Sequence, residues 1–192
     1  MEPKLILGSS SPRRQELLKQ VHIPFTIRKP EADESQITEQ NPEKKVAHLA
    51  QFKSRHINLL DSNEVILSAD TVVSFQNKIF EKPKSKDEAY HMISLLSGSI
   101  HDVYSGFTIR TNTEEKTFVE RTEVEFWPLD KQDIQWYIST DDPYDKAGAY
   151  GIQSIGAMFV KQIKGDYYNV VGLPISRVVK ELTKFGIKSE YN

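Results

Sequence analysis

The stretch from Val65 to Phe75 constrains the fold of this chain more than any other part of the sequence. It is mostly apolar, has no helical breaks and contains one carboxylate, Asp70. Such a run predicts a strand buried within a sheet. A carboxylate there must be paired, bind a metal or have a shifted pKa, because an unpaired charge in a dry interior is prohibitively costly. Asp70 is therefore a candidate functional residue, unless it lies at a strand end where it reaches solvent or caps a turn.

Helix and strand patterns alternate along the rest of the sequence. Strand patterns cover residues 5–7, 25–27, 103–110 and 117–126, and helix patterns begin near Pro12, Pro42, Lys86 and Asp130. Residues 157–163 and 167–171 predict a further hairpin around Gly165, and the final helix carries Ile175 and Phe185 on its apolar face. Interleaved elements of this kind predict an α/β protein with a mixed sheet.

The composition limits the possible classes of function. The 192 residues include 25 Lys and Arg against 27 Asp and Glu, so the formal net charge is −2. We therefore expect no stable nucleic-acid complex and no binding to an anionic membrane through bulk charge. The sequence has no cysteine, which excludes thiol nucleophiles, Cys-ligated zinc and iron–sulfur clusters.

Neither a linker nor an internal repeat interrupts the sequence, so we expect a single domain over residues 1–192. The apolar run from Leu5 to Leu7 is far shorter than a signal-peptide core, and no stretch of about 18 apolar residues occurs. We therefore expect neither export nor membrane insertion, and a cytoplasmic location. The oligomeric state stays open, with a homodimer among the alternatives.

The first chemical motif lies at the predicted turn from the first strand into the first helix. It contains Ser9, Ser11, Arg13 and Arg14, with Pro12 at the first helical position. A helix N-terminus presents free N–H groups and a partial positive charge, and guanidinium groups bind phosphate oxygens bidentately. The motif therefore indicates an anion site. The alternative is that Ser11 merely caps the helix and both arginines are solvated.

Three further candidate sites lie before and after Asp70 in the sequence: an acidic loop, Lys53 and Lys82. The acidic loop at Glu31, Asp33 and Glu34 supplies oxygen ligands for Mg²⁺, although such loops are more often simply solvated. Lys53 falls on the apolar stripe of its helix, so it either snorkels outward or points into a polar cleft. Lys82 lies in a short lysine-rich loop that is equally compatible with a weak nucleic-acid patch.

The segment from Asp145 to Gln153 combines two glycines with Lys146 and Tyr150. Glycine lets a backbone approach a ligand closely, and a glutamine amide offers the donor and acceptor that suit a base edge. A purely structural loop is the alternative. Walker A, G-x-G-x-x-G, H-E-x-x-H and G-x-S-x-G sequences are all absent. The remaining cationic groups, carboxylates and Gly-containing loops are the parts of a phosphoryl-transfer site.

Several short segments occur in one order along the chain, and together they are specific although each alone is weak. They are Ser9-x-Ser11-Pro12-Arg13-Arg14, Asp33-Glu34, Ala69-Asp70-Thr71, Lys82-Pro83, Leu96-Ser97-Gly98, the run from Lys146 to Gln153, and Val171-Gly172-Leu173-Pro174. In wording and spacing they resemble the Maf family of nucleoside triphosphate pyrophosphatases, the septum-formation-inhibitor-like proteins. The resemblance implies hydrolysis of a nucleoside triphosphate to the monophosphate and pyrophosphate. It also implies two lobes around a central cleft, with a twisted sheet and flanking helices similar to the inosine-triphosphate pyrophosphatase fold.

The resemblance also implies roles for individual residues. Asp70 matches the catalytic carboxylate, and we expect Asp70 and Glu34 to hold Mg²⁺ or Mn²⁺. Cationic groups at the phosphates, hydroxyls at the helix start and groups near the base complete the predicted site: Lys53, Lys82, Lys146, Arg13, Arg14, Ser9, Ser11, Thr71 and Gln153.

The predicted substrates are dTTP and UTP, and modified pyrimidine nucleotides are further candidate substrates. The pyrimidine subgroup of the family has Arg, Thr and Gln at the positions of Arg13, Thr71 and Gln153. A sister subgroup directed at 7-methyl-GTP has Trp, Gln and Glu there. Ser154 stands where the family frequently has Gly, next to the residue expected to read the base. The rival prediction is a non-catalytic nucleotide-binding regulator linked to cell division.

Overall fold

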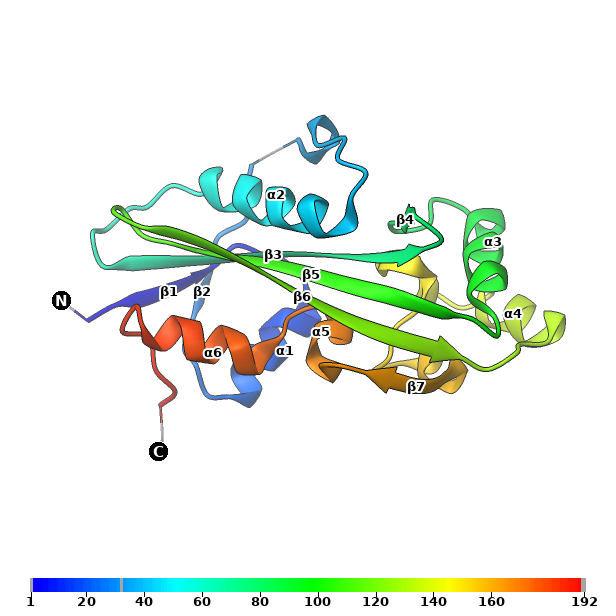
Figure 1. The fold of residues 1–192 in the computed structure, drawn as a ribbon. Helices are drawn as coiled ribbons and strands as arrows, with labels where there is room; N and C mark the ends of the chain where they lie inside the picture. Colours follow the sequence, from blue (N-terminus) through cyan, green and yellow to red (C-terminus); the bar gives the residue numbers. More distant parts are fainter. Residues whose placement is uncertain (1, 32, 191–192) are drawn as a thin grey trace.

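The computed structural model describes residues 2–31 and 33–190. One sheet of seven strands runs through the molecule in the order β2-β1-β3-β5-β6-β7, and β4 pairs with β3 (Figure 1). Strand β1 is parallel to β2 and β3, and the other pairings are antiparallel. The strands are β1 (Lys4–Leu7), β2 (Thr26–Ile27), β3 (Glu64–Phe75), β4 (Lys78–Phe80), β5 (Ile100–Arg110), β6 (Glu115–Phe126) and β7 (Val160–Lys164). The predicted mixed sheet is confirmed.

Helices cover both faces of this sheet. In Figure 1, α2 lies on one face, α1, α5 and α6 lie on the opposite face, and α3 and α4 lie near one end. The α-helices are α1 (Pro12–Gln20), α2 (Pro42–Arg55), α3 (Lys86–Leu96), α4 (Lys131–Tyr137), α5 (Tyr167–Val171) and α6 (Ile175–Thr183). Short 3₁₀ helices are η1 (Glu34–Gln36), η2 (Asp142–Asp145), η3 (Ala147–Ala149) and η4 (Ile155–Phe159). None of the described helices is long and apolar enough to cross a membrane.

Strand β3 is the long central strand that the apolar run predicts. It pairs with β1 at its beginning and with β5 along most of its length, so that Asp70 lies opposite Gly106. Helix α2 packs closely against β5 at this point, because a Cβ atom on Gly106 would lie 2.4 Å from the carbonyl oxygen of Val46. The missing side chain thus sets the distance between α2 and the sheet beside Asp70.

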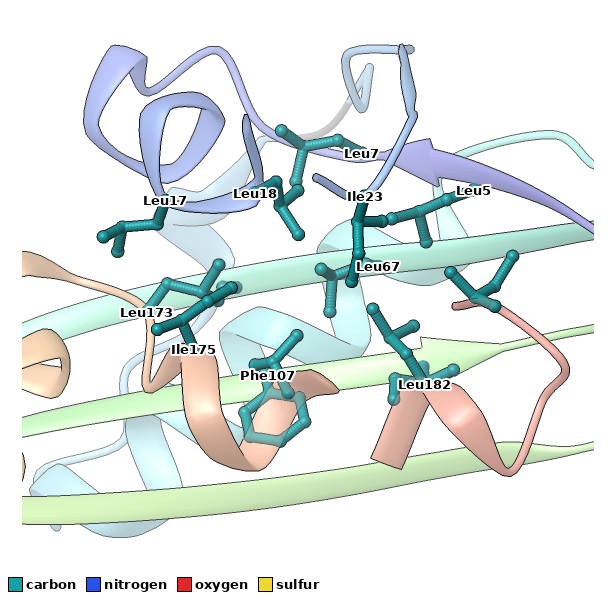
Figure 2. Packing of buried hydrophobic residues seen from close by; sticks show 14 of the residues in the cluster. Leu5, Leu7, Leu17, Leu18, Ile23, Leu67, Phe107, Leu173, Ile175 and Leu182 are labelled. Carbon is teal, nitrogen blue, oxygen red and sulfur yellow. The ribbon is translucent and has the colours of Figure 1, made fainter. Parts of the chain in front are cut away.

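Two hydrophobic clusters lie along the sheet on either side of the middle of β3. The first includes Leu67 and Ala69 and joins β1 and β3 to α1 and α6 (Figure 2). The second includes Val73 and joins the other end of the sheet to α3, α4 and η4. Asp70 and Thr71 belong to neither cluster. The polar centre of β3 therefore lies between two packed regions.

The predicted hairpin of residues 157–163 and 167–171 is wrong, and residues 157–159 belong to the 3₁₀ helix η4. Residues 167–171 form helix α5 instead of the second strand of a hairpin, and β7 pairs with β6. The Asp166 carboxylate accepts a hydrogen bond from the Tyr168 N–H at 2.7 Å, which starts the helix, and Gly172 ends it at φ +123°. This cap and the Gly172 turn outweigh the strand propensity of the Tyr and Val side chains.

Candidate active site

The described residues surround one cleft of about 1020 Å³ that contains the middle of β3. Its walls come from the start of α1, the segment around η1, the inner face of α2, the loop after β4 and the segment that follows η2. Every predicted site residue lines it: Ser9, Ser11, Arg13, Arg14, Glu34, Lys53, Asp70, Thr71, Lys82, Lys146 and Gln153. Residues up to 144 positions apart in the sequence thus share one solvent-accessible space, including Arg13 and Asp70.

Asp70 is paired with Lys53 at the centre of the cleft. The Lys53 Nζ atom lies 2.5 Å from Asp70 Oδ1 and 3.0 Å from Glu34 Oε2. The side chains of Lys53 and Asp70 are only 12% and 15% exposed, whereas that of Glu34 is 46% exposed. Lys53 therefore points into the polar cleft and does not snorkel outward. The two carboxylates and one ammonium leave this cluster with a net negative charge.

Asp70 and Glu34 offer a suitable donor set for a hard divalent cation, because an oxygen of each carboxylate lies within 3.0 Å of the same atom, Lys53 Nζ. Mg²⁺ is commonly held by one or two carboxylates together with substrate phosphates and water. Within the described part of the chain, no group of three or more His, Cys, Asp and Glu side chains is placed to hold a metal ion. The other ligands would therefore be phosphate oxygens and water. Of the acidic loop, Asp33 caps η1 by accepting from the Ser35 N–H at 3.1 Å.

The start of α1 forms a second, cationic part of the cleft. Ser11 occupies the N-cap position and Pro12 the first helical position, as predicted, but the Ser11 hydroxyl makes no capping hydrogen bond. Instead, the Ser9 hydroxyl accepts from the Ser11 N–H at 3.2 Å. The first turn has no acidic side chain. An anion would therefore find helix N–H groups and two arginines with little competing negative charge on the helix itself.

Arg14 is partly buried in the lining of the cleft. Its guanidinium donates to the Gly172 carbonyl at 2.8 Å, to Thr71 Oγ1 at 3.1 Å and to Ser9 Oγ at 3.2 Å. Burial lowers the pKa of Arg14 from its ordinary value, although the charge of Asp70 opposes this shift. All three acceptors are neutral, so the positive charge of Arg14 attracts an anion into the cleft.

Arg13 is held differently, by a carboxylate that the sequence did not single out for a role. Its Nη1 atom lies 2.7 Å from Asp145 Oδ2, and its Nη2 atom donates to the Asp145 carbonyl at 3.3 Å. Asp145 also accepts from Lys146 Nζ at 2.7 Å. Nothing in the sequence indicates this pair, because α1 and η2 are far apart along the chain.

The remaining predicted residues differ in how free their polar groups are. Thr71 Oγ1 is within hydrogen-bond distance of Ser105 Oγ at 2.7 Å, donates to the Gly172 carbonyl at 3.2 Å and accepts from Arg14. By contrast, Gln153 is exposed at the cleft and makes no side-chain hydrogen bond with another described residue. Thr71 is thus fixed in place, whereas the Gln153 amide is available to a ligand.

Sequence reasoning also missed an ion pair at the edge of the cleft. Lys45 Nζ lies 2.6 Å from Glu81 Oε1, and both residues line the cleft beside Lys82. Lys45 stands two helical turns before Lys53 on α2, so its spacing was the signal that could have identified it.

Comparison of the sequence with known proteins shows the family to which the chain belongs. A sequence profile described as Maf-like protein matches residues 4–185. The chain belongs to the Maf family. The Maf relatives include a dTTP/UTP pyrophosphatase from Halalkalibacterium halodurans, 46% identical over 191 residues and 100% of both chains. Another dTTP/UTP pyrophosphatase, from Bacillus cereus, is 46% identical over 184 residues and 96% of each chain.

Solved structures show the fold of this Maf chain. A HAM1 protein from Coxiella burnetii has a TM-score of 0.52 at 12% identity, with 95% of this chain and 99% of that chain covered. The Staphylococcus aureus Ham1 protein has a TM-score of 0.53 at 12% identity, with 93% and 99% covered. At this identity the likeness concerns the fold alone, and it confirms the predicted fold class.

Proposed function

We infer that this Maf protein is a nucleoside triphosphate pyrophosphatase that hydrolyses dTTP and UTP to the monophosphate and pyrophosphate. The observation that carries this function is the 46% identity over the full chain to a dTTP/UTP pyrophosphatase. The cleft supports it, because cationic groups from α1 face the carboxylates of β3 and η1 across one space. A triphosphate with a divalent cation needs both kinds of charge.

The phosphates bind between the start of α1 and the lysines of the opposite wall. Arg14 provides a fixed positive charge below them, and Lys82 adds a charge from the loop after β4. Arg13 exchanges its contact with Asp145 for a phosphate oxygen, since a guanidinium binds either anion bidentately. Ser9 and Ser11 line the same wall and position the helix start.

Asp70 and Glu34 hold Mg²⁺ or Mn²⁺ when it is bound. The cation supplies charge neutralisation for the phosphate oxygens. Asp70 orients the attacking water and accepts its proton, while Lys53 fixes the direction of the Asp70 carboxylate through the contact between Nζ and Oδ1. The water oxygen forms a bond to the α-phosphorus, and the bond to the bridging oxygen breaks with release of pyrophosphate.

Gln153 contacts the edge of the pyrimidine base, because its exposed amide provides both a donor and an acceptor. Discrimination by such a group is strong, since the wrong base leaves polar groups unpaired. Thr71 instead helps to hold Arg14 below the phosphates. Lys146 lines this wall between Asp142 and Asp145.

The test is pyrophosphate release from a panel of pyrimidine and purine nucleoside triphosphates, with Mg²⁺ or Mn²⁺. We expect dTTP and UTP to be hydrolysed in preference to purine nucleotides. Nucleotide binding without release of pyrophosphate from any member of the panel would instead favour the non-catalytic regulator. The single domain over residues 1–192, the cytoplasmic location, the homodimer and the lack of a nucleic-acid complex stay predictions.

A further inference from the structure

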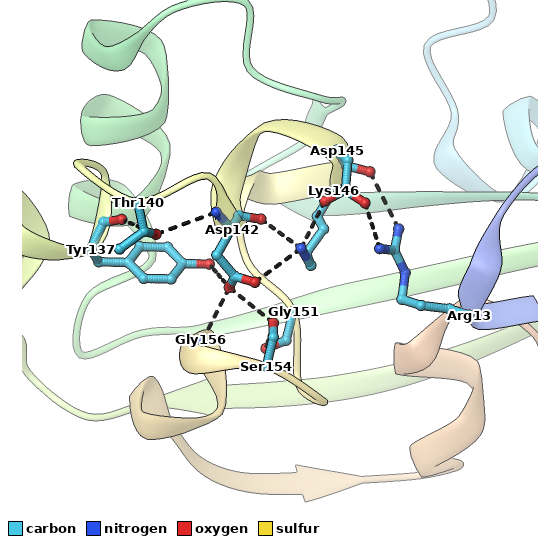
Figure 3. Close-up of polar contacts among 9 residues, drawn as sticks. All are labelled: Arg13, Tyr137, Thr140, Asp142, Asp145, Lys146, Gly151, Ser154 and Gly156. Atoms are coloured by element: carbon cyan, nitrogen blue, oxygen red, sulfur yellow. Dashed lines mark hydrogen bonds and ion pairs between the residues drawn. The ribbon is translucent and has the colours of Figure 1, made fainter. Parts of the chain in front are cut away.

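A carboxylate behind the cleft wall, Asp142, collects hydrogen bonds from several segments. Asp142 Oδ2 accepts from the Tyr137 hydroxyl at 2.8 Å, from Ser154 Oγ at 2.9 Å and from the Gly156 N–H at 3.4 Å (Figure 3). Asp142 Oδ1 lies 3.1 Å from Lys146 Nζ. The Asp142 side chain is only 12% exposed. It does not line the cleft, and the proposed reaction gives it no role.

The charge state of Asp142 suits this position. Burial alone would raise the pKa of its carboxyl group, but hydrogen bonds from Tyr137, Ser154 and Lys146 lower it below the ordinary value. Burial, together with the hydrogen bond to Asp142, raises the pKa of Tyr137. Near neutral pH, Asp142 is therefore an ionised acceptor and Tyr137 a neutral donor, which keeps all of these hydrogen bonds in place.

The segment that carries Gln153 is folded tightly around this carboxylate. A Cβ atom on Gly156 would lie 2.9 Å from the backbone N and O of Gly151, and one on Gly151 would lie 2.5 Å from Cε of Lys146. The two glycines thus let the chain turn back on itself between residues 151 and 156. Ser154 and Gly156 then attach the returning half of this turn to Asp142, and Gln153 stands immediately before the attachment.

We propose that Asp142 and Ser154 are positioning residues that hold Gln153 for selection of the base. The proposal rests on the base-reading role of Gln153 proposed above. An amide distinguishes donor from acceptor on a base only if its direction is fixed, and the exposed Gln153 side chain has no protein partner of its own among the described residues. Its backbone is therefore the part that the protein fixes, through the neighbouring Ser154 hydroxyl.

The test compares UTP with CTP, whose bases differ in the donor and acceptor pattern of one edge. We expect Ser154→Ala and Asp142→Asn each to reduce the ratio of kcat/KM for UTP to that for CTP by about fivefold, as expected for the loss of one positioning hydrogen bond. Ser154→Thr keeps the hydroxyl, and the backbone at position 154, with φ −125°, accepts a β-branched side chain. We therefore expect this variant to have the same UTP to CTP ratio as the unaltered protein. Thermal unfolding of each variant identifies any loss of fold.

Two controls separate this proposal from the function on which it rests. Ser139→Ala removes another serine hydroxyl bond, to the Trp136 carbonyl, and should leave the ratio unchanged. Gln153→Ala should reduce the ratio, and adding Ser154→Ala to it should cause no further reduction. If Gln153→Ala reduces the ratio but folded Ser154→Ala and Asp142→Asn do not, the positioning role is wrong and the proposed function stands. If Gln153→Ala itself leaves the ratio unchanged, the base-reading role is wrong and this proposal fails with it.

Discussion

At the scale of single residues, the two neighbouring arginines of α1 have different surroundings. The guanidinium of Arg14 donates to neutral acceptors, whereas that of Arg13 contacts the Asp145 carboxylate. The sequence predicts an anion site from both, but it cannot predict which arginine already has an anionic partner. Arg13 has an anionic partner because Asp145, at the end of η2, lies close to the start of α1 in the folded chain. We therefore expect a bound phosphate to compete with Asp145 for Arg13 and to have no such competitor at Arg14.

This competition predicts the effect of Asp145→Asn. The neutral amide holds Arg13 less strongly, so the KM for UTP should fall by about threefold, the modest change expected for an exposed ion pair. Lys146 keeps its contacts with Asp142 in this variant. Steady-state kinetics at low and high salt measure the change, with Asp141→Asn as a neighbouring control that lacks the contact with Arg13. A KM for UTP that rises would show that Asp145 supports binding instead of competing with it.

At the scale of elements, local patterns predict the long helices and strands well. The apolar run of β3 and the helix starts at Pro42 and Lys86 all lie where the sequence places them. Helix α5 was missed because a short segment with Tyr and Val side chains carries the pattern of a strand, and only the turn at Asp166 and Gly172 distinguishes them. Most cleft residues were predicted from their own chemistry, and the family resemblance added Thr71 and assigned the roles. Contacts such as that of Lys45 with Glu81 were not predicted, because they depend on how the elements pack.

The close packing of α2 on β5 predicts a difference between two glycine substitutions. Gly106→Ala places a Cβ atom against the backbone of Val46, so we expect a loss of about 2 kcal/mol in the free energy of unfolding. A Cβ atom on Gly8 would clash with Cδ1 of Ile57, the end of a flexible side chain, and would lie 3.4 Å from the Leu67 carbonyl oxygen and Ser68 Cβ, so Gly8→Ala should cost clearly less. Urea unfolding compares the two variants. Equal losses would mean that α2 adjusts to the added methyl group as easily as Ile57 does.

At the scale of the whole molecule, the cleft lies where two hydrophobic clusters meet along the sheet. The second cluster surrounds a buried polar pair in which His101 Nε2 lies 2.7 Å from the Tyr150 hydroxyl. Tyr150 also lines the cleft. Stability of this cluster is thus linked to the wall that carries the proposed base-reading segment.

The buried His101 predicts a pH dependence of stability. Burial lowers the pKa of His101 from 6.5 to about 3, so the unfolded chain binds a proton between these values and the folded chain does not. The contribution of neutral His101 to the free energy of unfolding is fully present above about pH 6.5. Below that pH the free energy of unfolding falls by up to about 1.4 kcal/mol per pH unit. His101→Gln, compared by urea unfolding between pH 7 and pH 5, should show a shallower decline. Parallel curves for the two proteins would contradict this account of His101.

Asp70, held by Lys53 across the cleft from α1, is proposed to direct water to the α-phosphorus of a bound triphosphate. The most direct measurement is pyrophosphate release from UTP by Asp70→Asn, together with its circular dichroism and its thermal unfolding. We expect kcat to fall by about 10³-fold while the fold is kept, because the variant loses a general base that also orients the reacting groups. Full activity in a correctly folded Asp70→Asn protein would contradict it.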